Sequence, residues 1–234
     1  MPRSARVSPK KVISAARKGS RRQDYSSSTK SALLDNATEL FADHGYAGTS
    51  LDEVVAAARV TKGALYHHFP SKLALFESVY DRLQEKTTRE IEKKLNKVKD
   101  PWERAAVGLK VFLDVCREPQ FRRIVLQEGP VALGHERWTQ SEKSASLGII
   151  QRTVDAMLKD LGGAEELSES FAIVFYGATR SASEYVADAE DPDAAAREVQ
   201  AAIGAILAGM RLLPSIGLDV EDAGETIEGR LPST

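Results

Sequence analysis

The stretch LDEVVAAARVTKGALYHHFPSK, residues 51–72, decides the fold of this chain. Its first eight residues carry apolar side chains at helical spacing, and two hydroxyl residues, Thr49 and Ser50, precede them as natural N-caps. Acidic side chains occupy the first turn at Asp52 and Glu53, where the helix dipole favours negative charge. The pattern predicts a short, half-buried helix.

A second short helix follows after a turn at Arg59-Val60. Thr61 is its expected cap, Leu65 is expected to face the core, and Phe69-Pro70 ends it. Five residues of this helix are expected to face outward. They are a cation, two small residues, an aromatic residue and a histidine: Lys62, Gly63, Ala64, Tyr66 and His67. Small residues let a backbone approach bases closely, while the longer polar side chains reach phosphates. The two helices therefore predict a helix-turn-helix that reads DNA.

The expected contacts divide by chemistry. Contacts to base edges are expected from the start of the second helix, at Thr61, Lys62, Gly63 and Ala64. Contacts to phosphates, which position the protein without reading sequence, are expected from Thr49, Ser50, Tyr66, His67 and Lys72.

This string resembles the DNA-binding domain of the TetR family of bacterial transcriptional regulators. The matching positions are Ala37, Leu40, Phe41, Gly45-Tyr46, Thr49-Ser50, Val54, Val60, Gly63, Leu65-Tyr66, His68-Phe69 and Ser71-Lys72. Arg59 departs from the pattern, which usually has Gly or Ala there. The resemblance covers residues 29–87 and implies a homodimer that binds a palindromic operator in double-stranded DNA. It also implies a repressor that an unidentified small-molecule effector releases from that operator.

The N-terminal end is strongly basic. Residues 1–30 carry nine lysines and arginines against Asp24 alone, although the whole chain has a formal net charge of -2. Few large apolar side chains occur in residues 1–28, so we expect a flexible basic arm ahead of a support helix over residues 29–44. The arm either contacts DNA or is a solubilising tail, and its sequence leaves both open.

The composition limits the cellular environment in which we expect the protein to act. The chain has 234 residues, 42% of them hydrophobic, and one cysteine, Cys116, which excludes an intrachain disulfide framework. No apolar run of about twenty residues is evident, so we expect no membrane span. A cytoplasmic bacterial protein, associated with the nucleoid when bound to DNA, fits these features.

Beyond residue 88 the pattern remains helical, with Gly and Pro punctuation and no sustained alternation of strand type. The fold class is therefore all-α: a three-helix DNA-binding domain over residues 29–87, then a regulatory, ligand-binding and dimerisation bundle over residues 88–234. Two segments rich in small residues, 168–188 and 193–213, are expected to pair with their symmetry mates. The alternative is that they complete the core of the monomer.

By the same resemblance, the bundle encloses a small-molecule pocket. The candidate lining residues are aromatic or soft side chains: Phe112, Cys116, Phe121, Trp138, Phe171, Phe175 and Tyr176. For each of them plain core packing is the alternative. Arg180 and Glu184, one helical turn apart, form either an ordinary ion pair or a grip on a polar ligand group.

No catalytic, metal or cofactor site is expected. The chain lacks the GxSxG, GxxxxGK[ST] and strand-linked GxGxxG motifs, and the adjacent His67 and His68 point about 100° apart on a helix, too divergent to share one ion easily. Two alternatives to the ligand-released repressor remain. One is an activator or a ligand-independent regulator controlled by protein partners or by Cys116 oxidation, and the other is an enzyme or carrier with a vestigial DNA-binding head.

Overall fold

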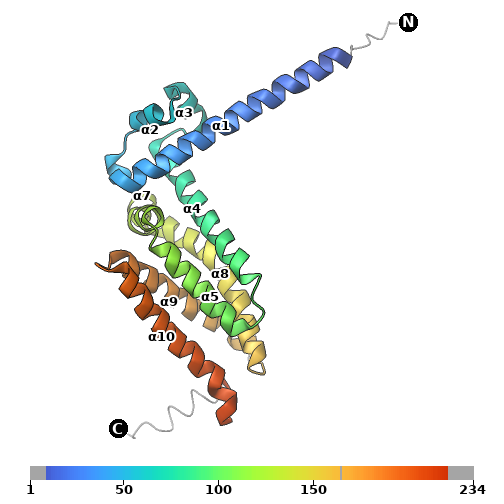
Figure 1. The fold of residues 1–234 in the computed structure, drawn as a ribbon, viewed down its shortest axis with the longest axis vertical. Helices are drawn as coiled ribbons and strands as arrows, with labels where there is room; N and C mark the ends of the chain where they lie inside the picture. The colour runs from blue at the N-terminus through green and yellow to red at the C-terminus, as the bar shows by residue number, and fades with distance from the viewer. Residues whose placement is uncertain (1–8, 164, 221–234) are drawn as a thin grey trace. The chain divides into compact units, whose positions relative to one another are not determined.

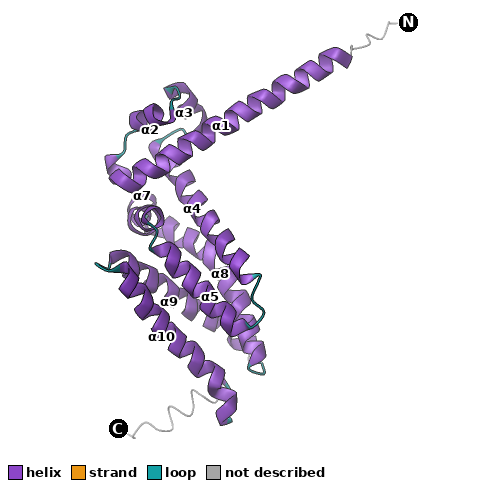
Figure 2. Ribbon diagram, in the orientation of Figure 1, coloured by secondary structure: helices purple, strands orange, loops and turns teal. Residues whose placement is uncertain are grey.

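The computed structural model describes residues 9–163 and 165–220, and every regular element among them is a helix (Figure 2). The chain divides into two compact units, Met1–Val79 and Tyr80–Thr234, called here the N-terminal and the C-terminal unit. Their boundary falls within one helix, eight residues before the end of the expected DNA-binding domain at residue 87. The predicted all-α fold is confirmed.

Four helices contribute to the N-terminal unit: α1 (Pro9–Gly48), α2 (Leu51–Ala58), α3 (Lys62–His68) and the start of α4 (Lys72–Leu95). Its core consists of fully buried apolar side chains from all four, including Leu33, Phe41, Val54, Leu65 and Phe76. The rings of Phe41 and Phe76 meet edge to face, with centroids 5.1 Å apart. This core fixes the two short helices, which are too short to be stable alone.

The N-terminal end of α1 differs from the flexible arm expected over residues 1–28. Residues 1–8 lie outside the described residues, but residues 9–28 are helical and run directly into the support helix (Figure 1). Their Lys, Arg, Gln and Ala content favours this, because these residues have high intrinsic helix propensity. The expected end of the support helix is confirmed: Gly45 has a φ of 72°, which breaks the helical path before Gly48.

The C-terminal unit contains the rest of α4 and a helical bundle. Its main helices are α5 (Pro101–Cys116), α8 (His135–Asp160), α9 (Ser168–Asp188) and α10 (Pro192–Leu212). Shorter turns connect them: α6 (Pro119–Phe121), the π-helix η1 (Arg122–Glu128), α7 (Gly129–Leu133), and the 3-10 turns η2 (Glu165–Leu167) and η3 (Leu213–Ile216). Helix α5 packs against α8, α9 and α10, and α9 also packs against α8 and α10 (Figure 1).

Helix ends expected from the sequence at Asp100 and Asp191 are present in the structure. The carboxylate of Asp100 accepts a hydrogen bond from the Glu103 amide and caps α5, and Asp191 caps α10 in the same way. Gly129 is required by packing: a Cβ there would lie 3.0 Å from both the Trp138 and Tyr80 side chains. The expected segments 168–188 and 193–213 coincide, to within a residue, with α9 and α10.

One described segment, Pro192–Ile216, is long and apolar enough to cross a membrane by length and composition alone. No such run was expected from the sequence, in which this segment is rich in alanine and is interrupted by Arg197, Glu198 and Arg211. A single helix of this kind is weak evidence for a span, since helices of soluble proteins pass the same test. Only 11% of its most apolar stretch is buried, so α10 presents an apolar surface.

Candidate nucleic-acid interface and small-molecule cavity

Local capping builds the helix-turn-helix. Ser50 accepts a hydrogen bond from the Glu53 amide while the Glu53 carboxylate accepts one from the Ser50 amide, a reciprocal capping box at the start of α2. These bonds hold the pKa of Glu53 below its usual value. At α3, Thr61 accepts from the Ala64 amide. The predicted caps Ser50 and Thr61 are therefore confirmed, and each fixes where its helix begins. Thr49, the third predicted cap, does not cap α2, because its hydroxyl bonds to carbonyl oxygens of α1.

The turn between α2 and α3 depends on Arg59. Its φ of 53° and ψ of 43° place it in the left-handed region, where it ends α2 and donates its amide to the last turn. A residue without a Cβ reaches this conformation more easily, which explains why the family pattern usually has a small residue here and why Arg59, which departs from it, is held in an unfavourable backbone conformation. The arginine side chain is exposed beside the start of α3.

Helix α3 buries Leu65 completely and presents its opposite face to solvent. On that face Lys62, Gly63, Tyr66 and His67 are exposed, with Tyr66 at 55%, while Ala64 is half-buried. A Cβ on Gly63 would find only the Thr61 hydroxyl, 3.9 Å away, so the glycine is not needed for packing. The outward face expected from the sequence is thus formed.

Lys62, one of the expected base contacts, is already paired. The Nζ atom of Lys62 lies 2.8 Å from a carboxylate oxygen of Asp52, and both side chains are mostly exposed. This hydrogen bond raises the pKa of Lys62. Asp52 therefore orients Lys62 across the turn, and it also brings a negative charge to the face that would meet DNA.

Two of the expected phosphate contacts have structural roles. Thr49 is only 2% exposed, and its hydroxyl lies 2.9 Å and 3.0 Å from the carbonyl oxygens of Gly45 and Leu40. Its side chain secures the end of α1, which takes it out of the set of phosphate contacts. Lys72, at the start of α4, donates to the Ala47 carbonyl and lies 4.6 Å from the centroid of the Tyr46 ring.

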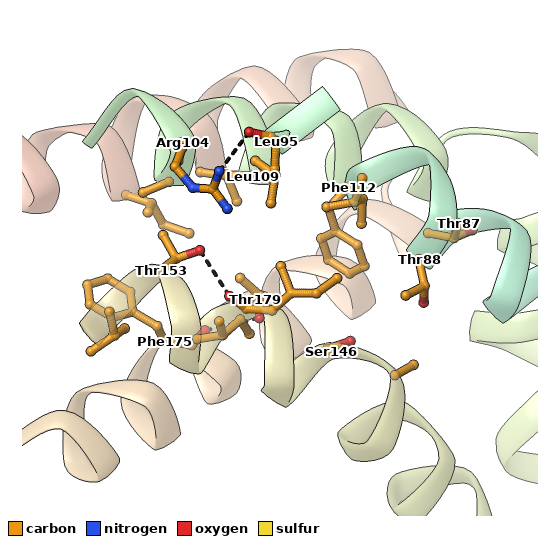
Figure 3. Close-up of a pocket in the computed structure, with 18 of the residues that line it drawn as sticks. Thr87, Thr88, Leu95, Arg104, Leu109, Phe112, Ser146, Thr153, Phe175 and Thr179 are labelled. Atoms are coloured by element: carbon orange, nitrogen blue, oxygen red, sulfur yellow. Dashed lines mark hydrogen bonds between the residues drawn. The ribbon is translucent and has the colours of Figure 1, made fainter. Parts of the chain in front are cut away.

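An apolar cavity lies within the C-terminal unit, between α4, α5, α8, α9 and α10 (Figure 3). Its volume is about 120 Å³. Of the seven lining residues expected from the sequence, Phe112 and Phe175 line it. The other five lie elsewhere: Cys116, Phe121, Trp138, Phe171 and Tyr176. These pack in the core or around a polar cluster, because shape and not aromatic character decides which side chains border a void.

The polar cluster is centred on Glu142. Its side chain is 11% exposed, its Oε2 atom has no hydrogen-bond partner among the described residues, and the Nε atom of Arg180 is 4.0 Å away. Burial raises the pKa of Glu142 to about 7. Arg180 also pairs with Glu184 at 3.2 Å and lies over the Trp138 ring. The intrahelical ion pair is therefore formed, and it lies beside this cluster rather than on the cavity.

Comparison with known proteins follows the same division of the chain. A family model described as bacterial regulatory proteins, tetR family, matches residues 33–79, and one described as tetracyclin repressor-like, C-terminal domain, matches residues 102–210. The Transposon Tn10 TetC protein of Escherichia coli is 31% identical over 139 residues, which cover 59% of this chain and 68% of that protein. The chain belongs to the TetR family. It is accordingly a DNA-binding transcriptional regulator with a helix-turn-helix.

Two further similarities differ in how much of this chain they cover. The negative transcriptional regulator IcaR of the biofilm operon icaADBC, from Staphylococcus aureus strain Newman, is 42% identical over 48 residues, which are 20% of this chain and 26% of IcaR. A TetR-family transcriptional regulator from Pectobacterium atrosepticum has 29% identity and a TM-score of 0.69, covering 80% of this chain and 95% of that one. The likeness to the solved structure therefore extends well beyond the DNA-binding domain.

Sequence reasoning missed several residues that the TetR-family fold brings to these sites. Lys30, on α1, lies 5.9 Å from the centroid of the Phe69 ring and so places a cation beside the end of α3. In the C-terminal unit, Arg104 and one face of α4 border the cavity. The α4 face has a helical signature in the sequence at Gln84, Thr87, Thr88, Ile91 and Leu95.

Among the described residues no group of three or more His, Cys, Asp or Glu side chains could hold a metal ion. The rings of His67 and His68 are 5.1 Å apart and inclined at 66°. Partial burial lowers the pKa of His68.

Proposed function

We propose that this chain acts as a homodimeric repressor that binds a palindromic operator and is released by a small-molecule effector. The observation that carries the DNA-binding part is the exposed face of α3, fixed by a cap at each helix start. Lys62, Gly63 and Ala64, with Thr61, supply the base contacts. The phosphate contacts come from Ser50, Tyr66, His67 and Lys72.

The dimer is supported by an apolar surface on α9 and α10. Ile173 and Val174 on α9 and Ile206 on α10 are more than half exposed. Gly177, Gly204 and Gly209 have open space where a Cβ would be, which allows another helix to approach closely. Exposure of such an apolar surface to water is energetically unfavourable, and pairing with a second copy of the chain buries it. This also accounts for the apolar length of α10 without a membrane.

The effector site in this proposal is the cavity of the C-terminal unit. Helix α4 supports a link to DNA binding, because it begins at Lys72, directly after the helix-turn-helix, and continues without interruption to the cavity residues from Gln84 to Leu95. An effector that binds more tightly to the form with low DNA affinity shifts the population toward it. By linkage, DNA then weakens effector binding by the same factor.

Control by Cys116 oxidation is disfavoured by the structure. The thiol is fully buried, and burial raises its pKa, which keeps it protonated. The thiolate is the reactive species, so this cysteine is expected to react slowly with peroxide. Control by a protein partner and activation instead of repression remain alternatives. A third alternative, an enzyme or carrier with a vestigial DNA-binding head, is the one that the first experiment addresses.

The experiment that tests DNA reading is selection of bound sequences from a random DNA pool, with the full chain and with Lys62→Ala. We expect a palindrome with half-site centres about 10 base pairs or a multiple apart, and loss of sequence preference at one or more positions in the variant. Lys110→Ala, an exposed lysine of the C-terminal unit, is the matched control and should select the native sequence. If the native chain enriches no sequence at low salt, the proposal fails.

The dimer is tested separately by measuring the mass in solution. Ile206→Glu places a charge on the apolar surface of α10 and is expected to yield monomers with weaker operator binding. Val131→Glu is the control, because Val131 is 80% exposed on α7 and lies outside the surface of α9 and α10. A native chain that is monomeric at micromolar concentration would contradict the proposed dimer.

A further inference from the structure

The cavity in the C-terminal unit is lined mainly by aliphatic side chains, and two of its threonine hydroxyls are bonded to backbone carbonyls of their own helices. Thr153 donates to the Ile149 carbonyl at 2.9 Å, and Thr179 lies 3.0 Å from the carbonyls of Phe175 and Tyr176. These threonines therefore present methyl groups to the cavity. Gln84, at another point of the wall, donates to the Tyr80 hydroxyl. Gln84, Thr153 and Thr179 therefore already have hydrogen-bond partners within the protein.

Arg104 differs from the rest of the lining. It is the one cation among the lining residues, and no aspartate or glutamate lines the cavity with it. Figure 3 shows Arg104 at the side of the cavity opposite Thr87 and Thr88, with its guanidinium extending into the space. The cavity thus has an apolar body and a single positive charge at one side.

The positive charge has only neutral partners in the part of the chain that the structure describes. Its Nη1 atom donates to the carbonyls of Leu95 at 2.7 Å and Val98 at 3.2 Å, at the end of α4, and no carboxylate lies within ion-pair distance. Carbonyl oxygens position the guanidinium without neutralising it. A partly desolvated cation without a counter-ion favours an anion at its remaining donors.

A second, polar hollow adjoins the cavity at the same place. Leu95, Arg104 and Ile149 border both spaces. On the other side of these three residues, Arg152 pairs with Glu92 at 3.0 Å. Because Arg152 neutralises Glu92, the carboxylate of Glu92 does not cancel the charge of Arg104. A ligand with its body in the cavity would therefore turn its polar end toward Arg104.

We propose that the effector is a small carboxylate with an apolar body of about six carbon atoms, held by a charge-assisted hydrogen bond from Arg104. This inference rests on the proposed effector site and adds the chemical class of its ligand. The size follows from the volume, since a cavity of about 150 Å³ lined by aliphatic and aromatic side chains holds a benzene molecule. The charge follows from Arg104, the strongest donor on the wall.

The test compares three probes of equal length, hexanoate, 1-hexanol and hexylamine, by calorimetric titration into the full-length protein. Hexanoate is expected to bind about ten- to a hundredfold more tightly than 1-hexanol, as for a hydrogen bond to a charged group. Arg104→Gln keeps a donor for the α4 carbonyls but removes the charge, and should reduce this preference to less than about threefold. Lys110→Gln removes a charge from the same helix outside the cavity and should keep the native preference.

The outcomes separate this inference from the proposed effector site. Equal binding of hexanoate and hexanol, or tighter binding of hexylamine, overturns the carboxylate assignment and leaves the cavity as a ligand site. Failure of all three probes to bind overturns both. If Arg104→Gln does not fold, the affinities of the three probes for the native chain still test whether the cavity prefers a carboxylate. Arg104→Lys, which retains the charge, should then keep a preference for hexanoate.

Discussion

Replacing Glu142 by glutamine should stabilise the C-terminal unit much more at pH 8 than at pH 5. Glu142 is 8% exposed, its nearest cation is 4.0 Å away, and burial raises its pKa from 4.5 to about 7. Between these two values the folded protein keeps a proton that the unfolded chain has released. The free energy of unfolding therefore falls as the pH rises from about 4.5 to about 7, and it stays at the lower level above pH 7.

The size of this effect follows from the shift. One pKa unit corresponds to about 1.4 kcal/mol, so the shift of Glu142 amounts to about 3 kcal/mol, to the nearest kcal/mol or so. Glutamine has the same shape and no charge to desolvate. Arg180 loses little in the variant, because it keeps Glu184 at 3.2 Å and the ring of Trp138. We expect Glu142→Gln to gain about 2 to 3 kcal/mol over the native chain at pH 8.

Urea denaturation at pH 5 and pH 8, at one fixed protein concentration, measures this difference. Both tryptophans of the chain, Trp102 and Trp138, lie in the C-terminal unit, so their fluorescence follows that unit. Glu184→Gln is the control, because Glu184 shares Arg180 but is 46% exposed. A stability difference between Glu142→Gln and the native chain that is the same at both pH values would refute the reasoning. A variant less stable at pH 8 than the native chain would instead identify a stabilising ion pair with Arg180.

Four further changes test the N-terminal unit and the thiol. Asp52→Asn should strengthen binding to random DNA several-fold at low salt, because it frees Lys62 and removes a negative charge, and an unchanged affinity in a fluorescence-anisotropy titration would count against this. Arg59→Gly should raise the free energy of unfolding of the N-terminal unit by about 0.5 to 1 kcal/mol by relieving the left-handed conformation, as monitored by hydrogen exchange, and destabilisation would show that the side chain has a packing role. Gly63→Ala should leave folding unharmed, since a Cβ fits, yet weaken specific binding by about tenfold or more; equal operator binding would remove Gly63 from the interface. Cys116→Ser should leave operator binding equally insensitive to peroxide, whereas a peroxide response that disappears with the thiol would restore the redox alternative.

The helix-turn-helix was predictable because its determinants are local. Ser50 and Thr61 lie within three residues of the amides that they cap, and the alternation of buried and exposed positions follows from helical periodicity. Thr49 shows the limit of this reasoning. A hydroxyl at a helix start is equally suited to phosphate or to a carbonyl, and only the position of the end of α1 sends it inward.

The cavity was beyond prediction from spacing alone. Aromatic residues were chosen as its lining because they dominate many ligand sites, but only Phe112 and Phe175 border it. Which side chains surround a void depends on how distant helices pack, and here the lining extends from Gln84 on α4 to Leu207 on α10. The residues next to Arg104 in the sequence give no indication that it borders a cavity. Its hydrogen-bond acceptors are the backbone carbonyls of Leu95 and Val98, at and just beyond the end of α4.

The sequence by itself determined the all-helical class, the caps and turn of the DNA-reading motif, the outward face of α3 and the bounds of α9 and α10, since all of these depend on contacts within a few residues or on helical period. The tertiary structure alone decided that Asp52 holds Lys62, that Thr49 and Cys116 are buried, that Glu142 lacks a close partner, and that Arg104 faces an apolar cavity. The physical reason is that burial, desolvation and the pairing of charges between helices arise only when distant segments pack together.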